Sequence, residues 1–397
     1  MAILAFSQFL QRLVRTDPPL QQGIATFRLV EQAVNDDRID EATDLIKYLI
    51  TEQQIGHEIF ARWTERMVRF ILKNDEKHVL RDVYEATMLP WLSTTVAPYF
   101  QEITGLSPKL TVDGETVHFT WEEAQLTVEL ARSNDTYPIK ITIRGQQCAP
   151  IHCLTNALME TFAQGKKDIA HEGIEDLMSW NCCVHEIYCD WCWALLTYIR
   201  DTFGENQFGP NMRSTMEDWI TERYKDMAKM SPEELLQLSV EGLRGEFFGK
   251  DLRGDIEVSE EPDRYVLAFD PCGTGGRMRR GVPQLGTPPR TEAPYNFGVS
   301  TGAYDWSWSQ KGVCLYCAHC ADINELLPID RIGHPMRVTE YPKEPGDKCR
   351  WFIYKNPDLI PDEYYAQVQR SRPKHQAPSR VTRTGSAHDN PSRSSKL

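Results

Sequence analysis

Three cysteines recur at every third position in one short stretch of this chain, and a histidine lies among them. The stretch covers residues 312–335 and reads GVCLYCAHCADINELLPIDRIGHP, with Cys314, Cys317 and Cys320 around His319. A gap of two residues lets two sulfurs point at one centre from a tight turn, which is the geometry that tetrahedral zinc needs. The spacing predicts a metal site, although reduced cysteines packed in a small core would show the same residues.

A second stretch follows an apolar run and reads DPCGTGGR, and its Cys272 could add a thiolate from the end of a strand. We therefore expect Zn²⁺ to be bound by Cys272, Cys317 and Cys320, with His319 or water in the fourth position. The chain has one such pair of cysteines here and no second pair to complete a four-cysteine ribbon. This favours an open metal site over a closed structural one, but only slightly.

Glycines and an arginine follow Cys272 directly. The backbone N–H groups of Gly273, Gly275 and Gly276 could converge on an anion, and the planar guanidinium of Arg277 matches a carboxylate. The spacing is not that of a standard phosphate-binding loop. We expect this loop to bind a substrate carboxylate; a plain tight turn after the strand is the alternative.

A third group of candidate residues lies on one helical face. Cys182, His185, Cys189 and Cys192 are spaced at three- and four-residue intervals and share that face. The face either packs into a helical core or presents His185 to a pocket as a general base. The neighbouring Glu186 lies about 100° further round the helix and is expected to be solvated.

The elements that position these residues can be located by periodicity. Helical spacing is found over 1–105, with a short amphipathic helix at the N-terminus, and again over about 150–248. Alternating runs predict an antiparallel meander over 110–145 and two strands within 253–270. Residues 277–311 are rich in glycine, proline and aromatic residues and predict a long functional loop or lid. A helix at 322–327 and strands at 336–339 and 349–354 complete the chain.

An internal repeat underlies this order. The motif at His57 (HEIFARW) reappears at His185 (HEIYCDW), and strands follow each helical block. We predict an α+β fold with a mainly helical body, built from two duplicated units that each place helices before small antiparallel strands. The units are expected at 1–146 and 147–366, with the cysteine-rich site in the second. Residues 367–397 should form a disordered basic tail.

Composition limits the partners. The net charge is −13. The tail from Val368 carries seven Lys/Arg and one Asp, which is +6 and leaves −19 on the body. An acidic body argues against nucleic acid, and no apolar run is long enough to suggest a membrane span. Eleven cysteines without a signal peptide indicate a reducing, cytoplasmic setting, or the peroxisomal matrix in a eukaryote because the chain ends Ser395-Lys396-Leu397.

Four stretches carry a resemblance: FDPCGTGGR, PYNFGVSTGAYDWSW, GVCLYCAHC and CRWFIYK. Over about 265–355 the chain resembles a group of mostly uncharacterised bacterial proteins of catabolic pathways, similar to zinc-dependent hydrolases of the trans-dienelactone hydrolase type. The resemblance implies zinc-assisted ring opening of a small carboxylated lactone or a related compound. The SKL end is not a feature of that group.

These observations combine into one functional hypothesis, a zinc-dependent hydrolase. Metal-activated water would attack a lactone, ester or cyclic amide carbonyl, His185 or His319 would carry the proton, and Arg277 would hold a small carboxylated substrate. Three thiolate ligands weigh against this mechanism, because they make zinc-bound water less acidic. The alternatives are a small-molecule-binding protein with a structural zinc site and a metal-free CxxC thiol or redox protein. The oligomeric state is open, and a homo-oligomer is compatible with the sequence.

Overall fold

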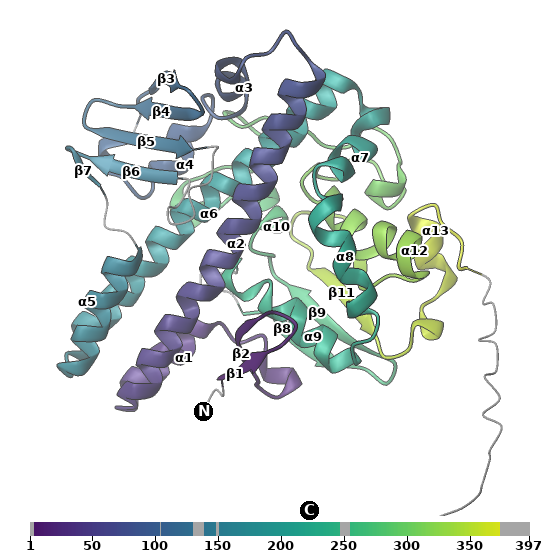
Figure 1. The fold of residues 1–397 in the computed structure, drawn as a ribbon, viewed down its shortest axis with the longest axis horizontal. Helices are drawn as coiled ribbons and strands as arrows, with labels where there is room; N and C mark the ends of the chain where they lie inside the picture. The colour runs from purple at the N-terminus through teal and green to yellow at the C-terminus, as the bar shows by residue number, and fades with distance from the viewer. Residues whose placement is uncertain (1–3, 104, 130–138, 148–150, 247–254, 374–397) are drawn as a thin grey trace, which may run out of the picture.

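Two long helices form the centre of the molecule (Figure 1). Helix α2 spans Ile39–Asn74 and helix α6 spans Lys167–Phe203, and they pack against each other. The structure, a computed structural model, describes residues 4–103, 105–129, 139–147, 151–246 and 255–373. The mixed architecture, with long helices and small antiparallel sheets, confirms the predicted α+β class.

The two central helices differ in how much of their surface is buried. On α2, an apolar stripe with three- and four-residue spacing is buried, including Leu45, Phe60 and Met67. On α6, every residue from Asn181 to Leu196 is buried, so this helix is covered on all sides at its middle. Shorter helices flank the pair: α1 (Thr26–Asn35) packs on α2, and α5 (Ile151–Ala163) packs on both.

The first sheet is the antiparallel meander that the sequence predicts. Its order is β3-β4-β5-β6-β7, and burial alternates along β5, so one face packs on the core and the other is partly exposed. Helices α3 (Leu80–Thr87) and α4 (Leu92–Val96) precede it. The strands are Lys109–Asp113, Thr116–Thr120, Ala124–Glu129, Ile139–Ile143 and Gln146–Gln147.

The second sheet is antiparallel and has the order β10-β11-β9-β8. Its central pair places Cys349 opposite Phe269, so the first residue of β11 lies beside the last residue of β9. Both strands were predicted from their alternating and aromatic residues. The strands are Glu257–Glu260 (β8), Arg264–Phe269 (β9), Val338–Glu340 (β10) and Cys349–Tyr354 (β11).

Short helices connect the central pair to this second sheet. A continuous helical run starts after Cys317: α11 (Ala318–Ala321), a π-helical turn (Asp322–Leu326) and α12 (Leu327–Ile332). The predicted helix at 322–327 lies inside this run. The others are α7 (Glu205–Ser214), α8 (Glu217–Met227), α9 (Pro232–Glu241), α10 (Gly275–Arg280) and α13 (Asp362–Gln367), with 3-10 turns at Pro19–Gln21, Gln101–Ile103, Arg244–Glu246, Pro283–Leu285, Asp305–Ser307 and Pro357–Leu359.

The prediction of an amphipathic helix at the N-terminus is wrong. Leu4–Ser7 (β1) and Arg12–Arg15 (β2) form a hairpin instead. The reason is tertiary: the backbone N–H of Arg15 donates to Glu241 Oε1 (3.1 Å), and its carbonyl accepts from Gln237 Nε2 (2.7 Å). Hydrogen bonds from a distant helix hold this backbone extended, and such contacts override a weak local preference.

The predicted unit boundary near residue 146 crosses a shared interior. The largest cluster of buried apolar residues includes Phe60 and Leu126 from the first unit together with Trp193 and Phe352 from the second. The predicted disordered tail falls largely on residues 374–397, which lie outside the described residues, as does the SKL end. None of the described helices is long and apolar enough to cross a membrane.

Candidate active site

A cavity of about 590 Å³ lies between helix α2 and the second sheet. One wall comes from α2, and others from α8 and from the end of α9 with the 3-10 turn Arg244–Glu246. The remaining wall consists of the 272–276 loop, the start of the helical run after Cys317, and residues of β10 and β11. The two chemically interesting stretches of the sequence thus share one cavity.

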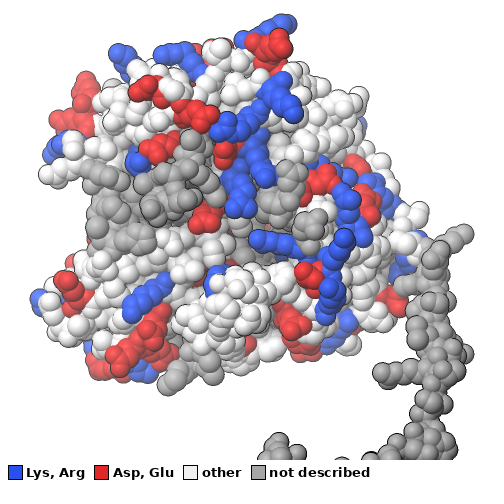
Figure 2. Space-filling model, in the orientation of Figure 1, with Lys and Arg blue, Asp and Glu red and all other residues white. Residues whose placement is uncertain are grey.

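Arginines outnumber acids on the cavity lining. Figure 2 shows a band of basic side chains down the middle of the face that carries α2 and α8 in Figure 1. An excess of positive charge around a largely apolar and aromatic hollow favours a small anionic ligand. The charged lining residues are Arg12, Arg62, Arg223, Arg279 and Arg337 against Glu58 and Glu246.

Four thiols line this cavity. Cys272 follows β9 by three residues, Cys317 and Cys320 begin the helical run, and Cys349 is the first residue of β11. Sequence reasoning missed Cys349, because it lies alone in the chain and only the pairing of β11 with β9 brings it here. A lone cysteine opening a strand beside a strand that ends near another cysteine was the available signal.

The loop of residues 272–276, which we call the glycine loop, packs tightly around two of these sulfurs. A β-carbon at Gly275 would lie 2.4 Å from Cys317 Sγ, far inside van der Waals contact. The Gly276 N–H donates to Cys272 Sγ (2.9 Å), and a β-carbon at Gly276 would lie 3.0 Å from the same sulfur. The glycines therefore let the loop approach the thiols closely. This contact joins the loop to Cys317.

The four thiols differ in acidity. A hydrogen bond from the Cys314 thiol lowers the pKa of Cys317, and the charge of Arg279 and a hydrogen bond from Tyr341 add to this effect against burial. Burial raises the pKa of Cys272, Cys320 and Cys349, and neighbouring thiols raise each further. Cys317 is thus the cavity thiol most readily converted to the nucleophilic thiolate.

Beside the thiols lies His319, whose ring is fixed by its neighbours. Its Nδ1–H donates to the Tyr316 carbonyl (2.6 Å), so Nε2 carries the lone pair. That Nε2 lies 3.6 Å from Cys320 Sγ, and Trp63 packs on the ring at 5.3 Å between centroids. Burial lowers the pKa of His319 to about 4, which keeps the ring neutral and able to accept a proton.

The wall matches zinc by ligand type but not by arrangement. Within the described part of the chain, no group of three or more His, Cys, Asp or Glu side chains is placed to hold a metal ion. The predicted ligands Cys272, Cys317 and Cys320 do line one wall, with His319 and Cys349 near them. Their sulfurs do not form the tetrahedral set that zinc requires. We derive no chemical step through a metal.

Arg277 and His185 lie behind the glycine loop. Neither is among the cavity-lining residues. The Arg277 guanidinium is buried and pairs with Glu186, which also pairs with Arg290 (2.7 Å). Glu186 is only 2% exposed, so the expectation that it is solvated is wrong. The ion pairs provide the reason, because they supply the positive charges that a buried carboxylate needs.

His185 contacts the glycine loop from helix α6. Its Nε2–H donates to the Gly273 carbonyl (3.2 Å), and Cys189 Sγ lies 3.4 Å from the same nitrogen. Burial, and then the nearby charge of Arg277, lower the pKa of His185 well below its usual range. The thiols of Cys182, Cys189 and Cys192 are buried with it, as the packing alternative predicted. In this position His185 can orient the loop.

The most informative charge in the cavity belongs to Arg337, the residue before β10. Its Nη1–H donates to Ser239 Oγ (3.3 Å), and its guanidinium carbon lies 5.1 Å from the Trp351 ring centroid. Its Nε is buried without a hydrogen-bond partner, and no carboxylate of the described residues forms an ion pair with it. Burial lowers the pKa of Arg337, while Tyr224 and Cys320 oppose the shift. No motif or spacing in the sequence points to this residue.

Comparisons of the chain with protein-family models, curated proteins and solved structures find no match.

Proposed function

We propose that the protein is a hydrolase that binds a small carboxylate-bearing substrate in this cavity and attacks its ester or lactone carbonyl with Cys317. The observation that carries the proposal is the half-buried Arg337, which lines the cavity with a buried, unsatisfied Nε and without a carboxylate partner among the described residues. Arg337 lines the same cavity as His319, Cys317 and Cys320. An anion bound at Arg337 would therefore lie close to the thiols.

The free energy of placing a charge in the protein interior favours an anionic ligand at Arg337. Transfer of a charged group from water into a protein interior is costly unless an opposite charge compensates it. Arg337 has one neutral hydrogen-bond acceptor, Ser239, and one aromatic face, Trp351. A substrate carboxylate would supply the missing counter-charge, and a guanidinium binds a carboxylate with two parallel hydrogen bonds. This residue replaces Arg277 in our proposal, because Arg277 is already paired with Glu186.

The chemistry follows from the two neighbouring groups. The Cys317 thiolate forms a sulfur–carbon bond to the carbonyl, and the bond to the leaving oxygen breaks to give a thioester. Water then attacks the thioester, and His319 Nε2 accepts its proton. The carboxylic acid leaves and the thiolate is restored. The Tyr316 carbonyl accepts from Nδ1–H of His319 and so leaves Nε2, which lies beside the Cys320 sulfur, as the accepting nitrogen.

A zinc-bound state is the second candidate, and Cys349 is the observation that favours it. With Cys349, four thiols line one wall of the cavity, which is the ligand number of a structural zinc site. Their sulfurs would have to move to close around an ion. A zinc site of this kind would support the second sheet of a binding protein, and metal analysis separates it from the thiol hydrolase.

Two further sequence inferences stay with this proposal. Membership of the zinc-dependent trans-dienelactone hydrolase type stays a proposal that goes with the zinc-bound candidate, and the position of FDPCGTGGR and GVCLYCAHC around one cavity supports it. We also retain the duplication, supported by the similar lengths of α2 and α6, 36 and 37 residues, and by the facing rings of His57 and His185 at 6.3 Å.

The test uses 4-nitrophenyl hydrogen terephthalate, an ester whose carboxylate is too far from the carbonyl to assist its own hydrolysis. Cys317→Ser should lower kcat/KM by at least about 10²-fold. Arg337→Met should raise KM at least about tenfold for this ester but not for 4-nitrophenyl benzoate, which lacks the carboxylate. Full activity in Cys317→Ser would refute the nucleophile. Equal effects of Arg337→Met on both esters would refute the carboxylate site.

A further inference from the structure

Glu246 ends the 3-10 turn Arg244–Glu246 and lines the same cavity as Cys317 and His319. Its carboxylate forms no hydrogen bond or ion pair with any residue in the described ranges. It differs in this from Glu52 and Glu241 nearby, which both pair with Arg244. A half-buried carboxyl group that lines the cavity, with no partner among the described residues, is suited to act on whatever occupies the cavity.

The position of Glu246 is fixed by close backbone packing. A β-carbon at Gly56 would lie 3.3 Å from Glu246 Cγ, so the glycine allows the glutamate stem to lie flat on α2. A β-carbon at Gly245 would lie 2.6 Å from the Glu52 carbonyl oxygen, so the turn itself contacts the α2 backbone. These contacts restrict the stem of Glu246 and aim its carboxyl group along the cavity wall.

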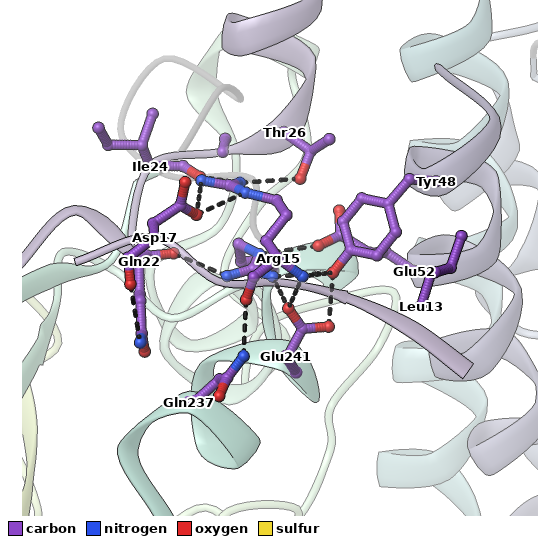
Figure 3. A network of polar contacts seen from close by, with 12 residues as sticks. Leu13, Arg15, Asp17, Gln22, Ile24, Thr26, Tyr48, Glu52, Gln237 and Glu241 are labelled. Carbon is purple, nitrogen blue, oxygen red and sulfur yellow. Dashed lines mark hydrogen bonds and ion pairs between the residues drawn. The ribbon is translucent and has the colours of Figure 1, made fainter. Parts of the chain in front are cut away.

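A buried polar network holds the turn on α2. Arg244 Nε–H donates to Glu52 Oε1 (2.7 Å), and Arg244 Nη2–H donates to Tyr48 Oη (2.9 Å). Figure 3 shows how this network extends around Arg15, which contacts the segments on either side of it. Arg15 Nη1–H donates to the Ile24 carbonyl (2.7 Å). The network has no substrate-facing role of its own, and it explains how a short turn can hold Glu246 rigidly.

We propose that Glu246 is the general acid of the reaction and protonates the leaving oxygen when the bond to it breaks. This inference rests on the proposed hydrolase function and adds a second catalytic residue to it. In the first step the proton moves from the Glu246 carboxyl to the leaving alkoxide, which departs as an alcohol. During thioester hydrolysis His319 accepts a proton from water. After hydrolysis this proton is transferred to the Glu246 carboxylate, which restores its acid form and balances the protons over the cycle.

The surroundings favour the protonated form of this group. Burial raises the pKa of Glu246 to about 8, so the carboxyl carries a proton near neutral pH. The titratable groups that feel its charge are Cys189 and Cys192 on α6 and Tyr316 ahead of the helical run. All of these are neutral when protonated. On the α2 side, the opposite charges of Glu52 and Arg244 are paired with each other.

The first test compares two leaving groups. The 4-nitrophenolate of 4-nitrophenyl hydrogen terephthalate leaves without a proton, whereas the methoxide of methyl hydrogen terephthalate needs one. Glu246→Gln should lower kcat on the methyl ester by roughly 10²-fold or more and change kcat on the nitrophenyl ester by less than about threefold. Equal loss on both esters, or no loss on either, would overturn the acid role. If Cys317→Ser loses activity on both esters while Glu246→Gln loses neither, the hydrolase proposal is retained and the acid role of Glu246 is refuted.

The second test needs no substrate. A carboxyl group with a raised folded-state pKa binds a proton that the unfolded chain has lost, so stability falls as pH rises between about 5 and 8. The unfolding equilibrium constant of the wild type should therefore increase by about tenfold per pH unit relative to Glu246→Gln and to Glu246→Met. Glu85→Gln, which removes an exposed carboxyl paired with Arg81, should keep the wild-type slope. Parallel pH profiles for the wild type and both Glu246 variants would contradict the proposal.

Discussion

Gly275 and Cys317 meet so closely that a β-carbon at position 275 would lie 2.4 Å from the Cys317 sulfur. The contact joins the loop after β9 to the start of the helical run, two stretches separated by about forty residues of chain. Either segment therefore limits the position of the other. Because Gly275 has no side chain, the Cys317 sulfur can lie directly against the loop at the cavity wall.

The first prediction follows from this contact. Gly275→Ala should destabilise the protein by about 1–3 kcal/mol, because an added methyl group in a tight contact forces the loop or the thiol to move. Chemical denaturation gives the stability change, and the rate of Cys317 alkylation reports the shift of the sulfur. Gly346→Ala is the matched control, since nothing lies within 4 Å of a β-carbon there. Equal effects of both variants would contradict the contact.

The second prediction concerns the pH dependence of thiol reactivity. A lowered pKa means that the Cys317 thiolate persists to lower pH than a free cysteine, so its alkylation by iodoacetamide should reach half its maximal rate at a lower pH than that of a free cysteine. The raised pKa of Cys320 predicts slow modification in the same range. Peptide mapping by mass spectrometry measures both rates. Arg279→Gln should move the Cys317 midpoint upward; faster labelling of Cys320 than Cys317 would argue against the assignment.

The third prediction separates support from catalysis at His185. His185→Ala removes the hydrogen bond to the Gly273 carbonyl and should cost about 1–3 kcal/mol of stability. It should also change the alkylation rate of Cys317, because the loop that His185 holds contacts that sulfur. His57→Ala, at the position that the proposed duplication makes equivalent and also buried, should lower stability without changing that rate. An unchanged Cys317 rate in His185→Ala would show that the histidine is only a packing residue.

The fourth prediction concerns the buried network of Figure 3. Arg244→Ala leaves Glu52 and Glu241 buried without their shared cation and should destabilise the fold by about 3–5 kcal/mol. Thermal and chemical unfolding measure the loss. Arg350→Ala serves as the control, because its pair with Glu340 is exposed and should cost about 1 kcal/mol or less. Similar losses at both arginines would contradict the structural role of the network.

The fifth prediction is a metal analysis. The sulfur arrangement predicts well under one zinc per chain in protein purified without chelator, and activity that survives chelator treatment. One zinc per chain, lost from both Cys272→Ser and Cys317→Ser, would support the zinc-bound alternative instead.

Local patterns predicted much of the fold. Alternation predicted the meander, because the side chains of its strands face the core on one side and are partly exposed on the other. Strands β9 and β11 were also predicted, and most residues of both are buried. Helical spacing predicted the two long helices. The N-terminal hairpin was missed, since Glu241 and Gln237 that hold it lie more than two hundred residues away. Interactions at that sequence separation leave no trace in a local period.

Sequence motifs predicted some residues of the candidate site and missed others. Cys272, Cys317 and Cys320 were identified because their spacing and glycine context form recognisable motifs. Cys349 and Arg337 were not, because each stands alone in the chain and gains its significance from burial and neighbours. Glu186 shows the converse error, since a charged residue that was expected to be solvated is buried with its partners Arg277 and Arg290.

Direct observation of the covalent intermediate tests the central claim most sharply. Protein mixed with 4-nitrophenyl hydrogen terephthalate and quenched in acid should carry one terephthaloyl group, located by mass spectrometry on Cys317, and the group should disappear as turnover proceeds. Arg337→Met should accumulate less of this adduct at the same ester concentration. Steady hydrolysis with no acyl group on Cys317, or undiminished hydrolysis by Cys317→Ser, would contradict the account.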